Sequence, residues 1–157
     1  MRRKEKRCTD HKILLDFLNE AKVMNLAMQT GGAPYVIPLH YVYNNDSLYF
    51  HCANEGYKIE LMQKYPEVGF TINEFERTIS TNANNPCATG SRYKSIVGDA
   101  RAEIVKSNCN KVAILNALMA KYTGRTEAIE FKDETLAEVN IVKLAIAYMD
   151  FKVDSRG

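Results

Sequence analysis

The run Tyr35–Ala53, YVIPLHYVYNNDSLYFHCA, determines the fold class, because it reads as two β-strands joined by a tight turn. β-branched and aromatic residues, which favour strands, are frequent in Tyr35–Tyr43 and in Ser47–Ala53. Between these runs lies Asn44-Asn45-Asp46, whose side chains tolerate the positive φ angles of a two-residue hairpin turn. The segment is therefore predicted to form an antiparallel hairpin.

The register of this hairpin follows from its turn. With Asn45 and Asp46 as the loop pair, Tyr43 faces Leu48 and His40 faces His51. One face is then apolar or aromatic throughout and is predicted to be core: Ile37, Leu39, Tyr41, Tyr43, Leu48, Phe50 and Cys52. The other face mixes apolar and polar side chains: Val36, Pro38, His40, Val42, Tyr49, His51 and Ala53. A second buried contact or a ligand is expected to cover this second face.

Outward from the hairpin, hydrophobic periodicity predicts further strands and several helices. The expected helices are one from a cap at Thr9-Asp10 to about Lys22, one over Glu55–Lys64 capped by Asn54, one between Ser107 and Gly124, and a turn at Asp133–Ala137. The expected strands are Val23–Gln29, Val68–Asn73, Arg77–Thr81, Tyr93–Val105 with a bulge or bend at Gly98, and Val139–Val153. Turns are expected at Thr30–Pro34 and Asn82–Gly90.

Strands outnumber helices in this order, and the tight hairpins imply antiparallel pairing. The predicted fold is mainly β with peripheral helices, in which six to seven strands close into a barrel. A chain of 157 residues that is 46% hydrophobic can bury a core without disulfides or a metal, so one domain over residues 1–157 is expected. Its basic beginning, residues 1–8, is predicted to be a flexible, solvated leader.

Composition excludes several functions. The net charge of +2 is too small to indicate a nucleic-acid or membrane partner, and no apolar stretch approaches the roughly 20 residues of a membrane-spanning helix. The protein is therefore expected in the cytoplasm. The four cysteines, Cys8, Cys52, Cys87 and Cys109, are scattered and are expected to be reduced thiols.

Metal and nucleophile chemistry lack complete residue sets. His40 and His51 are predicted cross-strand neighbours, but no third ligand shares their face, so no metal site is expected. Cys52 points to the predicted core and is interpreted as an inert buried thiol. The chain has no phosphate-binding Walker loop, dinucleotide fingerprint or serine-hydrolase elbow.

The segment Leu48–Lys58 is the most informative about function. It runs from a strand into a helix start, where free backbone N–H groups favour an anion, with His51 at the strand end and Lys58 in the first turn. These groups are candidates for binding a phosphate. The alternative is that Lys58 is a solvated helix residue and His51 a half-buried structural histidine.

Motifs along nearly the whole chain resemble one known family. They are Met1–Lys4, Gly32–Leu39, the Leu48–Ala53 strand with Gly56-Tyr57-Lys58, Tyr93–Gly98 and Lys121–Gly124. In order and spacing they resemble the pyridoxamine 5′-phosphate oxidase-like flavoproteins, and within these the nitroimidazole-resistance (Nim-type) branch.

The resemblance implies a split β-barrel homodimer with one FMN in each of two clefts between subunits. It places Val36, Ile37, Pro38 and Leu39 along the isoalloxazine ring through backbone contacts and includes His40 among the cofactor-binding residues. It places Phe50 and His51 on the strand leading to the phosphate, Lys58 on the phosphate itself, and Tyr93, Ser95 and Ile96 on the partner subunit. His51 matches the histidine that Nim-type relatives use in reductive chemistry. The implied function is an FMN-dependent oxidoreductase or flavin reductase, with a small-molecule electron donor and acceptor.

Three departures separate the chain from a true pyridoxamine phosphate oxidase. Tyr57 stands beside the phosphate lysine where that enzyme has Arg, His40 stands where it has a basic substrate-binding residue, and the closing C-terminal Trp and Arg are absent. Vitamin B6 oxidation is therefore not expected. The alternatives left open are a reductase using the deazaflavin F420 and a flavin- or haem-binding protein without turnover.

Overall fold

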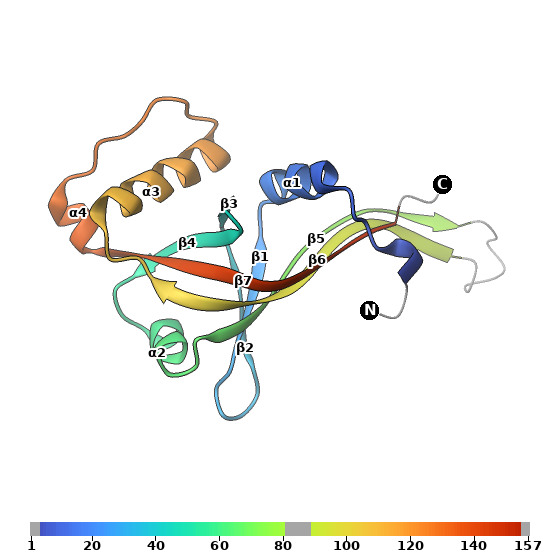
Figure 1. Cartoon of the computed structure of the whole chain (residues 1–157), viewed down its shortest axis with the longest axis horizontal. Helices are drawn as coiled ribbons and strands as arrows, with labels where there is room; N and C mark the ends of the chain where they lie inside the picture. The colour runs from blue at the N-terminus through green and yellow to red at the C-terminus, as the bar shows by residue number, and fades with distance from the viewer. Residues whose placement is uncertain (1–3, 81–88, 155–157) are drawn as a thin grey trace.

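The fold is a single seven-stranded antiparallel sheet with helices at its ends (Figure 1). The computed structural model describes residues 4–80 and 89–154. The strand order is β2-β1-β5-β6-β7-β4-β3. The strands are β1 (Met24–Met28), β2 (Tyr35–Leu39), β3 (Val42–Asn44), β4 (Ser47–Ala53), β5 (Glu67–Ser80), β6 (Thr89–Ile104) and β7 (Val139–Asp154). The helices are η1 (Lys4–Lys6), α1 (His11–Glu20), α2 (Tyr57–Lys64), α3 (Asn108–Thr123) and α4 (Asp133–Ala137).

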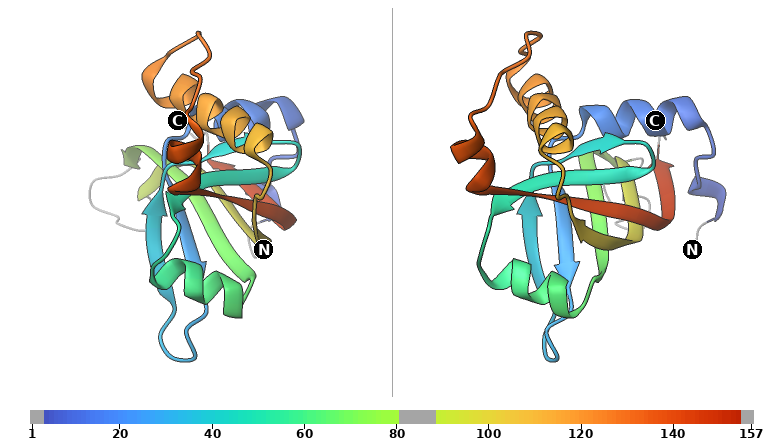
Figure 2. Two further views of the ribbon diagram at one scale, coloured as in Figure 1. Left: turned by 90° about the vertical axis from the view of Figure 1, so that its left-hand side faces the viewer. Right: turned by 60° about the vertical axis from the view of Figure 1, so that its left-hand side comes forward.

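The sheet curls around one main core, with α1 and α3 at one end and α2 at the other (Figures 1 and 2). The predicted core face of the hairpin supplies much of it, since Tyr41, Leu48 and Phe50 are fully buried. The remaining members of that face, Ile37, Leu39, Tyr43 and Cys52, are buried in or packed against the same core. The predicted mainly β, antiparallel, barrel-like fold with peripheral helices is therefore confirmed.

The hairpin turn is confirmed, and so is its register over Val42–Asn44, whereas the predicted pair of His40 with His51 lies outside the β3–β4 ladder. Asn45 and Asp46 both have positive φ, 46° and 53°, and Tyr43 pairs with Leu48. The predicted single strand Tyr35–Tyr43 is wrong, because the structure divides it into β2 and β3. β2 pairs with β1 and β3 pairs with β4, so the chain changes its pairing partner at His40-Tyr41. Pro38 is compatible with β2, since an edge strand can lack one backbone donor.

The two strands predicted at Val68–Asn73 and Arg77–Thr81 form one strand, β5, with a register shift between Phe75 and Arg77. The sequence predicted a break between two strands at this position, but the structure has a β-bulge within one strand. Thr89 and Gly90 belong to β6, not to the predicted loop. Thr81 and the loop residues 82–88 lie outside the described residues.

Gly98 is required by packing and not by a bulge at its own position. It pairs in register with Phe70 and Met149, and the shift between β6 and β7 lies one step further on, between Asp99 and Ala100. A Cβ on Gly98 would lie 2.5 Å from Phe70 Cζ and 2.5 Å from the Tyr148 carbonyl oxygen. Only glycine leaves room for the Phe70 ring there.

Two helix starts agree with the sequence and one does not. The Asp10 carboxylate accepts from the N–H groups of Lys12 and Ile13, and the Ser107 hydroxyl caps α3, which ends at Gly124 with φ 72°. The predicted cap of α2 by Asn54 is wrong, because the helix begins two residues later than expected, after Gly56. The Asn54 amide instead donates to the Ala137 carbonyl at the end of α4. None of the helices in the described ranges is long and apolar enough to cross a membrane.

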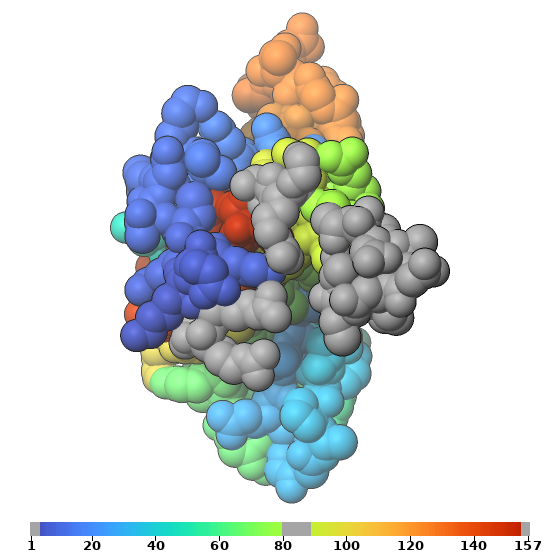
Figure 3. Space-filling view, turned by 90° about the vertical axis from the view of Figure 1, so that its right-hand side faces the viewer, coloured from blue at the N-terminus to red at the C-terminus, as the bar shows by residue number. Residues whose placement is uncertain are grey.

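Residues 4–8 of the predicted leader lie against β7 (Figure 3), so this part of the leader is in contact with the sheet. Lys6 forms an ion pair with the buried Asp154, and Arg7 forms one with Asp150 at 3.0 Å. The Cys8 N–H also donates to the Phe151 carbonyl at 2.9 Å. Two largely buried carboxylates on β7 need cationic partners, which explains why this basic segment folds back.

Candidate functional site

The second face of the hairpin is covered along only part of its length. Val42 on β3 and Ile141 on β7 form a small second core with Ile114 and Leu118 of α3, and Tyr49 packs against it. The expected second buried contact therefore exists and is α3. The rest of the face remains open, including His51, Ala53 and Val36, of which Val36 is 56% exposed.

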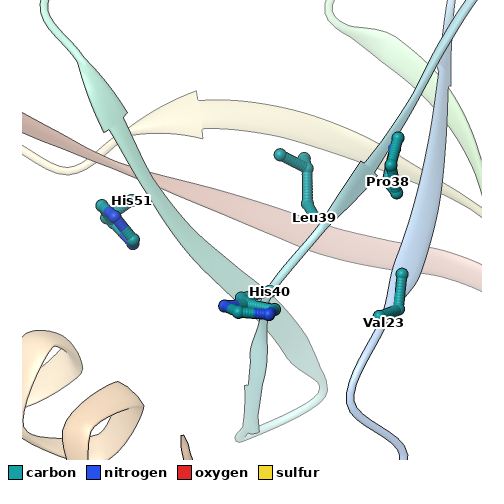
Figure 4. Close-up of a pocket in the computed structure, with 5 residues that line it drawn as sticks. All are labelled: Val23, Pro38, Leu39, His40 and His51. Atoms are coloured by element: carbon teal, nitrogen blue, oxygen red, sulfur yellow. The ribbon is translucent and has the colours of Figure 1, made fainter.

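A cavity of about 390 Å³ opens on this uncovered part of the face. Its lining consists of three apolar and two imidazole side chains: Val23, Pro38, Leu39, His40 and His51 (Figure 4). Val23 immediately precedes β1, His40 immediately follows β2, and His51 lies on β4. Three separate segments thus build a pocket suited to a planar apolar group with a polar edge.

Positive charge gathers beside this pocket. Partial desolvation lowers the pKa of His51 below its ordinary value, and the positive charges of His40 and Lys58 lower it further. Lys58 is half-buried in the first turn of α2. Because the Lys58 charge lowers the pKa of His51, the Lys58 ammonium group and the His51 imidazole lie within electrostatic reach of each other. Neither imidazole has a hydrogen-bond partner in the chain over the described ranges.

The start of α2 adds uncapped backbone donors. Gly56 precedes the helix with φ 117°, a conformation that side-chain-bearing residues rarely adopt, and no side chain caps the helix. The first backbone bonds run from Ile59 and Glu60 to the Gly56 carbonyl, so the earlier N–H groups have no intrahelical acceptor. Tyr57 packs edge-on against Tyr35 at 5.2 Å between ring centroids, which places the helix start beside the beginning of β2.

The structure brings only some of the predicted site residues together. Pro38, Leu39, His40 and His51 line the cavity, and Lys58 lies close enough to influence His51. Phe50 and Ile96 have fully buried side chains in the core, and Ile37 packs against that core. Phe50 and Ile96 therefore offer a ligand on the outer surface only backbone atoms.

Tyr93 and Ser95 lie on β6 and line two other cavities, each of about 290 Å³. Neither cavity shares a lining residue with the pocket of His40 and His51. Within one chain these two residues do not join the candidate site. Their assignment to a partner subunit stays a prediction.

Sequence reasoning missed two contributors to the pocket. Val23 lies in its wall, and Tyr122 of α3 stacks on His40 with 4.2 Å between ring centroids and 21° between the planes. The Lys121–Gly124 motif includes Tyr122, but it does not indicate which strand residue Tyr122 meets. Among the residues that the structure describes, no group of three or more His, Cys, Asp or Glu residues is placed to hold a metal ion.

Comparison with known proteins identifies the family. The family model described as pyridoxamine 5′-phosphate oxidase matches residues 10–153. The chain therefore belongs to the pyridoxamine 5′-phosphate oxidase family, and the predicted resemblance is confirmed at that level. No match was found among the curated proteins.

Solved structures show the same fold at low sequence identity. A protein from Bacteroides thetaiotaomicron VPI-5482, with a proposed role in 5-nitroimidazole antibiotic resistance, is 24% identical with a TM-score of 0.80, over 94% of this chain and 86% of that one. The FAD and haem binding protein of Mycobacterium smegmatis is 18% identical with a TM-score of 0.82, over 96% and 74%. The flavocytochrome Anf3 of Azotobacter vinelandii is 15% identical with a TM-score of 0.83, over 99% and 72%.

Proposed function

We propose that this protein is an FMN-binding oxidoreductase of the Nim-type branch, which takes electrons from a reduced nicotinamide or another donor and passes them to a small acceptor such as a nitro-aromatic compound. One observation carries the proposal. The pocket of His40 and His51, the Lys58 ammonium and the uncapped start of α2 all converge on one open face of the sheet.

The residues present fit a phosphate group. Desolvation first, and then the positive charges of His40 and Lys58, lower the pKa of His51, so cationic charge at this site disfavours the protonated imidazole. A phosphate monoester carries a charge of about −1.5 to −2 at pH 7 and would turn this repulsion into attraction. The free N–H groups at the start of α2 add donors of the kind that bind phosphates. Lys58, His51 and the backbone of Tyr57 would therefore hold the FMN phosphate.

The residues of β2 fit a flavin ring. β2 is at one edge of the sheet and pairs only with β1 among the described strands, so backbone groups along its other side are free for a ligand. Pro38 and Leu39 supply apolar wall, and His40 supplies a polar edge. Bound FMN supplies the redox chemistry, while the chain binds it, orients it and excludes water from one ring face.

His51 is the proposed proton donor at this site. Its imidazole is exposed to solvent, and a pKa below the ordinary 6.5 leaves it mainly neutral at pH 7 without a ligand. A bound phosphate would favour the protonated ring. A histidine that changes charge on ligand binding suits proton delivery to an acceptor that is being reduced.

The proposed assembly is a homodimer in which a second subunit closes the pocket. The outer surface of β6 and β7 exposes Val97 by 56% and Tyr148 by 49%, beside Ser95. Exposed apolar residues in the middle of a sheet suit a contact with a second copy. Sedimentation at micromolar concentration is expected to show a dimer, and a flavin-loaded monomer would contradict this proposal.

The absorbance spectrum of the purified protein tests the cofactor. A flavin spectrum that is bleached by a reduced nicotinamide and restored by a nitro-aromatic acceptor supports an FMN oxidoreductase, once release of the flavin distinguishes FMN from FAD. A deazaflavin spectrum would instead indicate a reductase using F420. A bound flavin that no donor bleaches would indicate binding without turnover.

Haem binding is the second candidate function. Two of the structural neighbours are named as haem-containing proteins, the FAD and haem binding protein by its name and Anf3 as a flavocytochrome. In this chain His40 and His51 present two exposed imidazoles beside one cavity, and an imidazole is a common axial ligand of haem iron. A haem spectrum that is lost when both histidines are replaced would favour this candidate.

A further inference from the structure

We propose that Tyr122, on the last turn of α3, is a positioning residue that fixes His40 and the neighbouring wall of the pocket. The effect of Tyr122 on flavin affinity rests on the proposed function, whereas its effect on the orientation of His40 does not. Tyr122 lies 81 positions from Tyr41 in the chain, yet its hydroxyl group bonds to the backbone at the point where β2 gives way to β3.

The hydroxyl group replaces sheet bonds that this part of the chain lacks. β2 ends at Leu39 and β3 begins at Val42, so Tyr41 lies between two ladders. The Tyr122 oxygen accepts from the Tyr41 N–H at 2.9 Å and lies 3.0 Å from the Tyr41 carbonyl oxygen. Because the Tyr41 side chain is fully buried, its backbone is poorly placed to bond to water. The Tyr122 hydroxyl group therefore supplies hydrogen-bond partners for the backbone of Tyr41 at the break between β2 and β3.

The same hydroxyl group also contacts the segment before β1, which lines another side of the pocket. It lies 2.8 Å from the carbonyl oxygen of Lys22, the residue before Val23. A phenol has one proton, so it donates to the Lys22 or the Tyr41 carbonyl at a given moment. Burial raises the pKa of Tyr122, so the proton stays on the phenolic oxygen. Tyr122 thus ties the segment before β1 to the segment after β2, and both segments line the pocket.

The ring of Tyr122 holds the His40 imidazole directly. The two rings are stacked at 4.2 Å, and the ammonium groups of Lys22 and Lys121 lie 5.5 Å and 5.8 Å from the centre of the Tyr122 ring. Stacking occupies one face of the imidazole, and both ring nitrogens lie on the edge of the ring. His40 is therefore fixed in orientation but has both nitrogens available to a ligand.

The histidine content of the chain makes this orientation measurable. There are three histidines, and His11 is an exposed residue of α1 that serves as an internal reference. Because the two rings are stacked, the ring-proton resonances of His40 are expected to lie upfield in the protein without flavin. Two variants separate the parts of the contact: Tyr122→Leu removes the ring and the hydroxyl group, and Tyr122→Phe removes only the hydroxyl group. Tyr43→Phe is the matched control, since it removes a phenol bond to Asp46 at the hairpin turn.

In Tyr122→Leu the His40 resonances are expected to move downfield while those of His11 stay in place. In Tyr122→Phe the His40 resonances should remain upfield, while the Tyr41 amide exchanges faster with solvent. Each Tyr122 variant is expected to weaken FMN binding about two- to tenfold, the effect of losing one neutral hydrogen bond. Tyr43→Phe should change none of these quantities.

Two results would overturn the proposal. One is a His40 spectrum that is unchanged in Tyr122→Leu. The other is a Tyr122→Phe variant whose Tyr41 amide exchange and FMN affinity both equal those of the wild type, a test that still applies if Tyr122→Leu does not fold. Wild-type protein that binds no FMN would instead contradict the proposed function, and the resonances of the flavin-free protein would still decide the role of Tyr122.

Discussion

Replacing Lys58 with Ala tests the phosphate site most directly. Lys58 is half-buried in the first turn of α2 and close enough to His51 to lower the pKa of that imidazole. A hydrogen bond to a charged group contributes about 1.5 to 3 kcal/mol. Lys58→Ala should therefore raise the Kd for FMN about 10- to 100-fold. Quenching of flavin fluorescence during titration measures this constant.

Riboflavin supplies the sharper comparison, because it has the ring and the ribityl chain without the phosphate. Its affinity should be the same for wild type and Lys58→Ala. Lys64→Ala is the matched control, since Lys64 lies in the last turn of the same helix with its ammonium 5.1 Å from the centre of the Tyr65 ring. Without any ligand, Lys58→Ala should also raise the pKa of His51 toward its ordinary value, as NMR titration can show. An unchanged Kd for FMN, or an equal loss for riboflavin, would refute the assignment of Lys58.

Three further predictions follow from the packing and the titratable groups. Gly98→Ala should destabilise the protein by about 1 to 3 kcal/mol in chemical denaturation, because its Cβ would lie 2.5 Å from Phe70 Cζ, whereas Gly32→Ala should stay within about 0.5 kcal/mol of wild type. Burial, with the charge of Lys22, lowers the pKa of Lys121 from 10.5 to about 8. Between these two pH values the unfolded chain binds more protons than the folded protein, so the free energy of unfolding should rise with pH. After allowance for solvent screening this rise is about 1 kcal/mol, and it should be missing in Lys121→Met over pH 8 to 9.5. His51→Gln should abolish the part of FMN affinity that increases as pH falls through the ordinary histidine pKa, and His51→Ala should slow flavin reoxidation by a nitro-aromatic acceptor at saturating FMN if His51 is catalytic.

Local chemistry explains the parts of the fold that the sequence predicts correctly. The Asn45-Asp46 turn, the Asp10 and Ser107 caps and the Gly124 end of α3 each depend on one or two residues and their own backbone. Alternation along the hairpin also predicts which side chains enter the core, because a strand has a period of two residues. Such features require no knowledge of distant segments.

Non-local contacts explain what the sequence does not predict. Where the chain changes its pairing partner at His40-Tyr41, the backbone bonds to a phenol from α3, and the N-terminal segment forms ion pairs with two carboxylates of β7. Asn54 follows a good capping pattern, yet its amide bonds to the end of α4 instead. In each of these contacts the partner residue lies more than 80 positions away in the sequence, so no local sequence pattern predicts the contact.

The candidate site illustrates a limit that strand geometry imposes on any prediction made residue by residue. A family match assigns consecutive residues such as Val36 to Leu39 to one ligand, but alternate side chains of a strand point to opposite faces. Ile37 accordingly packs against the core while Val36 is exposed, and Leu39, at the end of β2, packs against the core and also lines the pocket. Along this wall a flavin would meet mainly backbone, which side-chain substitution does not remove. Binding should therefore tolerate conservative changes at Val36 and depend more strongly on whatever holds β2 in place, which includes the Tyr122 contact at its end.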